Sequence, residues 1–312
     1  MLNRRHIRIK VMQSLYALQQ SGEKDIPREK KFLQERIYKL YHLYAVLLNL
    51  PVAIRNLAES HQEIAKKNFL ATAEDINPNK KFVNNTVLKT LHNNRNLAEY
   101  CKENKIDYWQ EDTEYVRLLW NAIKESDTYK RYMQKEHFSK KEDLAFITEI
   151  YQQIIAPDEK LYDYLISKEL SWTDDFPFVN TFIVRNLGKI RPFTDFNSRY
   201  LYKNEDDAVF AENLFKETLK HREEFFKDID AKTPNWDTDR IADIDFILLT
   251  MALTEFVYFD TIPTRVTINE YIEIAKDYST PKSSFFINGV LDKLLKEYKK
   301  ANKITKSGRG LL

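Results

Sequence analysis

Three arginines close to the N-terminus, Arg4, Arg5 and Arg8, are the residues whose type and spacing best suit a chemical task, the binding of phosphate. A guanidinium group carries a permanent positive charge and a fork of N–H donors that matches phosphate oxygens. Residues 1–20 and 276–312 together carry a net charge of +10, whereas the rest of the chain carries −8. If the fold brings the two ends together, we expect a basic surface suited to a nucleic-acid backbone. The alternative is that these charges lie on solvated helix faces and a solvated tail.

Side chains that could catalyse a reaction or bind a metal show no recognisable arrangement. The six histidines never occur four residues apart around a glutamate, and the single cysteine, Cys101, excludes a disulfide or a site of several thiolates. Five glycines leave no room for a phosphate-binding glycine loop. We therefore predict no enzymatic activity, no cofactor and no metal. Because the cysteine usage fits a reducing compartment and no apolar run reaches the roughly 18 residues of a membrane span, we expect a cytoplasmic protein without membrane contact.

Helices are expected to position the arginines. Five glycines and nine prolines are too few for the tight turns of a sandwich, a barrel or a doubly wound sheet, so we predict an all-α fold. Residues 4–20 predict a helix with one buried stripe and the arginines mostly off it. The stripe consists of Ile7, Val11, Leu15 and Leu18. Residues 28–69 also have a helical pattern, with an interruption expected near Pro51 because proline lacks the N–H of a helix interior.

The chain repeats part of itself at a constant offset of 64 residues. Eight identities relate residues 143–187 to residues 207–251 without a gap. The identical pairs are Asp143 and Asp207, Phe146 and Phe210, Glu159 and Glu223, Lys168 and Lys232, Trp172 and Trp236, Asp175 and Asp239, Phe182 and Phe246, and Ile183 and Ile247. The paired tryptophans, in a chain with only four, favour two copies of one helical unit. Chance agreement between helices of similar composition is the alternative.

Residues 262–298 form the most distinctive run of the chain. Pro263 and the β-branched character of residues 264–268 predict an extended segment, followed by a helix that begins at Asn269. After a short turn, a second helix is expected. Gly289 lies inside that second helix, where glycine costs about 1 kcal/mol relative to alanine. This cost suggests that another helix packs closely at Gly289.

These residues resemble the C-terminal signature of the NusB family of antitermination factors. The matching C-terminal residues are Pro263, Val266, Ile268, Asn269, Glu270, Ile274, Ala275, Lys276 and the run from Phe286 to Asp292. Further matches are Arg4, Arg5, Arg8, Leu15, Tyr16, Trp236, Asp239, Arg240, Ile244, Asp245, Ile247, Leu248, Ala252 and Glu255. The resemblance covers residues 1–20 and 206–296, about a third of the chain. Thr250 departs from the family, which often has arginine there, and His6 and Lys10 alter the basic helix.

The resemblance implies a helical fold of two small bundles. It implies a NusB-like core made of residues 1–20 and 206–300 and a helical expansion in residues 21–205. The charge pattern adds a basic tail at residues 301–312. Such a protein would bind the boxA element of nascent ribosomal RNA as a single strand, together with NusE, a ribosomal protein, in the RNA polymerase antitermination complex.

Individual roles also follow from the resemblance. The implied RNA-binding residues are Arg4, Arg5, Arg8, Tyr16, Lys276, Lys282 and Phe286. Tyr16 and Phe286 would stack on bases, or else pack in the core, since an aromatic side chain at helical spacing is often buried. Asp245 would face NusE, or else serve as a surface carboxylate at a helix start.

Two other functions compete with this hypothesis. The first is a protein-interaction module that keeps the NusB fold but has lost RNA binding, with residues 21–205 as its binding part. The second is an RNA-modifying enzyme, since a NusB-like domain also occurs fused to RNA methyltransferases. The chain has no glycine-rich cofactor loop and no catalytic cysteine motif in support of the second.

Overall fold

The protein is described by a computed structural model that covers residues 2–22, 26–135, 139–196, 202, 205–233 and 241–311. The chain forms two compact units, unit 1 (Met1–Ile37 and Leu201–Leu312) and unit 2 (Tyr38–Tyr200). Every regular element among the described residues is a helix, with no strand, so the predicted all-α fold class is confirmed. Unit 1 contains both ends of the chain, which is the condition for a shared basic surface.

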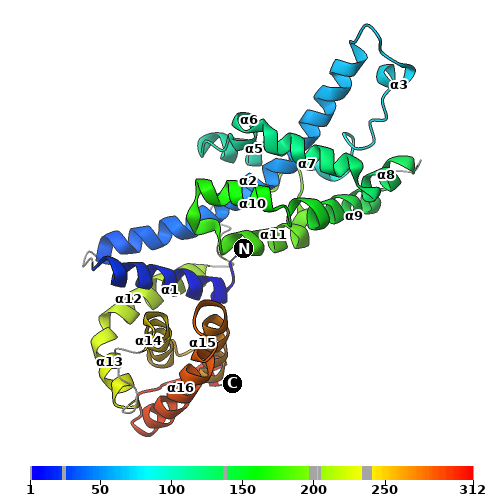
Figure 1. The fold of residues 1–312 in the computed structure, drawn as a ribbon. Coiled ribbons are helices and arrows are strands. Elements are labelled where there is room, and N and C mark those ends of the chain that lie inside the picture. Colours follow the sequence, from blue (N-terminus) through cyan, green and yellow to red (C-terminus); the bar gives the residue numbers. More distant parts are fainter. Residues whose placement is uncertain are drawn as a thin grey trace. The chain divides into compact units, whose positions relative to one another are not determined.

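Unit 1 is built around one central helix. Its elements are α1 (Arg4–Ser21), the start of α2 (Ile26–Lys66), α12 (Glu205–Lys220), α13 (Arg222–Asp230), α14 (Asp243–Tyr258), α15 (Thr264–Tyr278), α16 (Ser283–Lys300) and the 3-10 helix η6 (Gly308–Leu311). Helix α14 packs against α1, α12, α13, α15 and α16, and Figure 1 shows it in the middle of this group. Nearly every residue of α14 from Asp245 to Phe256 is buried, as expected for a helix that is apolar on all sides.

Helices α1 and α15 both run antiparallel to α14. Arg8 of α1 pairs with Glu255 near the end of α14, whereas Gln19 donates to Asp243 at the start of α14 (Nε2 to Oδ1, 2.6 Å). Thr267, close to the start of α15, also donates to Glu255 (3.1 Å). The starts of α1 and α15 therefore meet at the end of α14.

The structure confirms one predicted helix start and corrects another. Helix α1 begins at Arg4, as the apolar stripe predicts. Helix α15 begins at Thr264, directly after Pro263, so the extended segment predicted for residues 264–268 is wrong. Thr267 and Ile268 are buried in this helix, and the packing of their side chains outweighs the weak preference of β-branched residues for strands.

Unit 2 has an aromatic core of its own. Its elements are the rest of α2, α3 (Ala73–Ile76), α4 (Thr86–His92), α5 (Arg95–Glu103), α6 (Tyr108–Glu111), α7 (Thr113–Glu125), α8 (Asp127–Gln134), α9 (Lys140–Ile150), the π-helical turn η1 (Tyr151–Ile155), α10 (Glu159–Lys168), the 3-10 helix η2 (Leu170–Trp172), α11 (Asp175–Asn186) and the 3-10 helix η3 (Leu187–Lys189). Tyr132 and Phe146 stack with ring centroids 3.9 Å apart. The Trp109 Nε1 group donates to the Val46 carbonyl of α2 (2.9 Å), which satisfies a buried polar group of the indole.

Helix α2 continues through Pro51 without a break, so the interruption predicted there is wrong. Proline removes one backbone hydrogen bond, but the neighbouring side chains Leu50 and Val52 are buried and hold the helix in place. The same helix corrects a second expectation, because Pro27–Lys66 contains a window of 18 residues with a mean hydropathy of 1.3, apolar enough for a membrane span. This window is 72% buried inside the protein, as in a core helix.

The two halves of the predicted repeat fall on the same order of helices. Shifting α9, α10 and α11 by 64 positions lays them over α12, α13 and α14. Asp143 and Asp207, an identical pair of the repeat, are both buried, and each binds the first residue of another helix. Asp143 accepts the backbone N–H of Thr86 (2.8 Å), and Asp207 accepts the Nε–H of Arg4 (3.0 Å). Trp236 lies outside the described residues, and the duplication remains a prediction.

Candidate nucleic-acid interface

The side chain of Asn3 caps the start of α1. It accepts the backbone N–H of His6 (3.0 Å), which satisfies one of the donors that a helix leaves free in its first turn. Arg4 and Arg8 are four residues apart and share a helix face, and both guanidinium groups lie over the ring of Phe210. The cap thus fixes the start of the helix that carries Arg4, Arg5 and Arg8.

The side chain of Arg4 contacts α12. Its Nε donates to Oδ1 of Asp207 (3.0 Å), and the centre of its guanidinium is 5.0 Å from the Phe210 ring centroid. The Arg4 side chain is 39% exposed. Since a guanidinium has five N–H donors, the one ion pair leaves donors for a ligand.

Arg5 makes a two-point ion pair with Glu270 of α15. Its Nε and Nη2 donate to the two carboxylate oxygens at 2.9 and 3.0 Å, and the Arg5 side chain is 41% exposed. Burial raises the pKa of the Glu270 carboxyl, but the hydrogen bond from Arg5 and the charge of Arg8 outweigh burial, so the pKa is lowered. Glu270 is therefore ionised at neutral pH and neutralises part of this charge.

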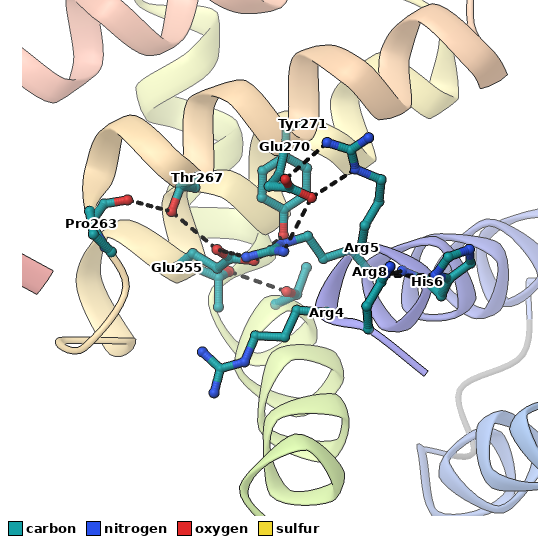
Figure 2. A network of polar contacts seen from close by, with 12 residues as sticks. Arg4, Arg5, His6, Arg8, Glu255, Pro263, Thr267, Glu270 and Tyr271 are labelled. Atoms are coloured by element: carbon teal, nitrogen blue, oxygen red, sulfur yellow. Dashed lines mark hydrogen bonds and ion pairs between the residues drawn. The ribbon is translucent and has the colours of Figure 1, made fainter. Parts of the chain in front are cut away.

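Arg8 lies inside the protein. Its Nε and Nη2 donate to Oε1 and Oε2 of Glu255 at 2.6 and 2.9 Å, and the exposed fractions of the two side chains are 2% and 0%. The hydroxyls of Tyr271 (2.8 Å) and Thr267 (3.1 Å) also donate to this carboxylate, as Figure 2 shows. A buried guanidinium that is held at two points by a buried carboxylate is not placed to bind a phosphate from solution, so the RNA contact predicted for Arg8 does not fit the structure. Its contacts hold α1 against α14 and α15.

A cleft of about 780 Å³ opens at the start of α1. Arg4, Arg5 and Arg309 line it with positive charge, and the carboxylate of Glu270 lies among them. Pro263 and Val266 give it an apolar wall. Its volume is in the range of small-ligand sites. Cationic donors beside an apolar wall suit an anion that also has an apolar part, such as a nucleotide.

The imidazole of His6 also lines this cleft but adds no charge at neutral pH. Burial, followed by the charges of Lys10 and Arg5, lowers the pKa of His6 from 6.5 to about 4. The charge of the cleft therefore comes from arginines, whose protonation is constant over the physiological pH range.

Tyr16 and Lys282 lie toward the other end of α1. Gln19, less than one turn beyond Tyr16, contacts the start of α14. Lys282 directly precedes Ser283, whose hydroxyl donates to Asp245 in the first turn of α14 (2.6 Å). Tyr16 follows Arg5 by eleven positions along the helix, or about 16 Å at 1.5 Å per residue. Tyr16 and Lys282 thus lie away from Arg4 and Arg5, and neither of them lines the cleft.

Asp245 does not present its carboxylate to a partner. It is buried, and its two oxygens accept the hydroxyls of Ser279 and Ser283, each at 2.6 Å. These bonds fix the turn between α15 and α16 to the start of α14. The contact with a protein partner predicted for Asp245 therefore does not fit its position.

The remaining predicted residues lie on α15 and α16. The ammonium of Lys276 pairs with Glu273 one turn earlier (2.6 Å) and is exposed. Phe286 is partly buried, whereas its neighbour Phe285 is 81% exposed. The family signature pointed to Phe286, but the aromatic ring that is open to solvent belongs to Phe285.

Other reactive groups do not extend the candidate site. Cys101 is buried in unit 2, and burial raises the pKa of its thiol to about 12, so it is a neutral thiol at pH 7. Among the described residues, no cluster of three or more histidine, cysteine, aspartate or glutamate side chains could hold a metal ion. The cleft at the start of α1 is thus the place where predicted functional residues meet.

The family match lies mostly in the second segment of unit 1, Leu201–Leu312. The sequence model of the NusB family matches residues 189–296. The transcription antitermination protein NusB of Salinibacter ruber is 48% identical over 103 residues, which are 33% of this chain and 64% of the relative. The protein of the same name from Chloroherpeton thalassium is 41% identical over 106 residues, or 34% of this chain and 49% of the relative. The chain thus spans about half to two thirds of the length of these two relatives. No solved structure matches the chain.

A third relative is covered more fully. The transcription antitermination protein NusB of Natranaerobius thermophilus is 37% identical over 98 residues, which are 31% of this chain and 70% of the relative. The region that the family model matches contains α12, α14 and α15, whose carboxylates pair with the arginines of α1. Together with the family match, this coverage shows that the chain belongs to the NusB family.

Proposed function

We propose that this protein is an RNA-binding factor of transcription antitermination, which binds single-stranded boxA-type RNA together with the ribosomal protein NusE in the cytoplasmic RNA polymerase antitermination complex. The observation that carries the proposal is the cleft at the start of α1, where half-exposed Arg4 and Arg5 lie beside an apolar wall. The three relatives support a role in transcription antitermination, since each is named a transcription antitermination protein.

The geometry suits a single RNA strand. Arg4 and Arg5 retain N–H donors after pairing with carboxylates, and these donors match phosphate oxygens. Pro263 and Val266 offer an apolar surface to the face of a base, which a single strand can expose and which a duplex hides by stacking. The buried pair of Arg8 and Glu255 positions the helix that carries both donors.

Binding of a fluorescently labelled boxA-like RNA tests the proposal, with a scrambled RNA of equal length as control. We expect affinity to fall with salt, and Arg4→Ala and Arg5→Ala to flatten the slope of log K against log salt by about 0.7 each. Lys293→Ala, on the exposed part of α16, removes the same charge away from the cleft and should leave the slope unchanged. NusE should strengthen binding of the boxA-like RNA only. Slopes unaffected by the two arginine variants would contradict the proposed surface.

Unit 2 supplies an observation in favour of the competing function. At the end of α2, Ile64, Phe69 and Leu70 are strongly exposed, with Phe69 at 99%. Exposed apolar side chains that gather in one region are typical of a protein-binding surface. A NusB-like protein that binds a protein and no RNA would be captured with the same partner before and after ribonuclease treatment, and would show no salt-dependent affinity for either RNA.

A further inference from the structure

The last residues of the chain form a C-terminal strap (residues 303–311) that returns to the end of α14. The ammonium of Lys306 donates to the carbonyls of Glu255 (3.0 Å) and Phe259 (2.7 Å). A cation at the C-terminal end of a helix is favourable, because the last carbonyls have no partner within the helix. Ser307 adds two bonds to Asp260, from its N–H to the carbonyl (3.1 Å) and from its hydroxyl to the carboxylate (2.8 Å). These contacts anchor the strap to the end of α14 and to the turn that follows it.

Gly310 brings the strap into close contact with the turn after α14. It is buried, and a Cβ atom added there would lie 1.8 Å from the carbonyl oxygen of Asp260. Only glycine fits at this distance. Gly308 also adopts a positive φ of 52°, which favours glycine. These two glycines fix the course of the backbone on both sides of Arg309.

Arg309 lines the cleft at the start of α1 together with Arg4 and Arg5. Its side chain is exposed, and it makes no ion pair with any residue that the structure describes. The other three arginines of the cleft are each balanced by a carboxylate, Arg4 by Asp207, Arg5 by Glu270 and Arg8 by Glu255. Arg309 is thus the cation that gives this group of side chains its net positive charge.

We propose that Arg309 is a phosphate-binding residue of the RNA site, and that the C-terminal strap exists in part to hold it there. This inference rests on the proposed function. RNA binding would not have to break an ion pair of the Arg309 guanidinium, so its N–H donors can make a two-point contact with a phosphate. Arg4 and Arg5, by contrast, share their donors with acidic partners.

The test uses the full-length protein and the labelled boxA-like RNA. If Arg309 contacts one phosphate, Arg309→Ala should flatten the salt slope by about 0.7 and weaken binding roughly fivefold near 0.1 M salt. Arg309→Lys keeps the charge and should retain most of the slope. Gly310→Ala keeps the arginine but displaces the strap, and should weaken binding as Arg309→Ala does. Lys293→Ala is the charge-matched control, and circular dichroism checks that each variant is folded.

The outcomes separate the two proposals. Wild-type protein that shows no salt-dependent RNA binding would overturn both the proposed function and the role of Arg309. Wild-type protein that binds RNA, with Arg309→Ala equal to it in affinity and slope, would overturn the role of Arg309 alone. Equal losses in Arg309→Ala and Lys293→Ala would also overturn it, because they would show a long-range effect of net charge.

Discussion

Arg8 and Glu255 form a two-point ion pair in the core of unit 1, although 247 positions separate them in the chain. Neither side chain is more than 2% exposed, and the hydroxyls of Tyr271 and Thr267 satisfy further lone pairs of the carboxylate. One carboxylate therefore joins α1, α14 and α15. An arginine that a family signature places among RNA ligands is, in this protein, part of the scaffold.

Replacement of Arg8 should destabilise the fold far more than replacement of Arg4. Arg8→Ala leaves the Glu255 carboxylate buried without a counter-ion, so we expect the free energy of unfolding to fall by about 3–5 kcal/mol. Arg4 is half exposed, and its ion pair should contribute no more than about 1 kcal/mol. Urea unfolding of both variants measures the difference. Equal losses would contradict the assigned roles, and Arg8→Met combined with Glu255→Gln should lose less than the two single changes summed.

Alanine substitutions of Phe285 and Phe286 should have different effects, the first on RNA affinity and the second on the free energy of unfolding. Phe285→Ala removes an exposed ring, so we expect a change of less than about 0.5 kcal/mol in the free energy of unfolding. If the ring stacks on a base, RNA affinity should fall by about 1–3 kcal/mol. Phe286→Ala should instead destabilise the protein by about 1–3 kcal/mol, since its side chain is partly buried. A loss of RNA affinity only in a folded Phe286 variant would show that this assignment is reversed.

Gly289 should be replaceable by alanine with a gain in stability. The close helix packing predicted at Gly289 is wrong, because the residue is exposed and an added Cβ would meet no atom within 4 Å. We expect Gly289→Ala to raise the free energy of unfolding by about 0.5–1 kcal/mol, through the better helix propensity of alanine. Thermal unfolding monitored by circular dichroism measures this change. A lower melting temperature would indicate a contact that the structure does not contain.

His6 should make stability depend on pH between about 6.5 and 4. The folded protein holds His6 neutral, because burial lowers its pKa to about 4, whereas the unfolded chain takes up a proton below about 6.5. The unfolded state thus binds more protons in this window, and stability falls as the pH falls. We expect His6→Gln to lose less free energy of unfolding than the wild type between pH 7 and pH 4.5. Urea titrations measure the free energy of unfolding, and identical losses in the wild type and His6→Gln would contradict this linkage. Between pH 7 and 8, where His6 is largely neutral in both states, the two proteins should show nearly the same pH dependence.

The helices of unit 1 could be predicted because their patterns are local. The stripe through Ile7 and Val11 and the run from Phe286 to Asp292 repeat at helical spacing, so each predicts its own helix without knowledge of the rest of the chain. The residue type predicted the local structure less well where tertiary packing determines the backbone conformation. Residues 264–268 are β-branched but helical, and Pro51 lies within an unbroken helix, because burial of the neighbouring side chains outweighs these preferences.

The candidate site was only partly predictable because its partners are distant in sequence. Arg4 and Arg5 could be assigned from charge, but the burial of Arg8 depends on Glu255. One signal was available, since Glu255 is a lone carboxylate late in a strongly apolar helix and must find a partner there. Arg309 gave no comparable signal, because its position follows from backbone contacts of Gly310 and Lys306 that no residue pattern reveals.

The sequence distance between Arg8 and Glu255 also determines the order in which the protein can fold during synthesis. At about 5–20 residues per second, a ribosome adds Glu255 roughly 12–50 s after Arg8. All of unit 2 is made in that interval and can complete its core first. During this time Arg8 of the nascent helix α1 has no Glu255 to pair with. In a growing polypeptide, the basic segment made first is thus among the last to be neutralised.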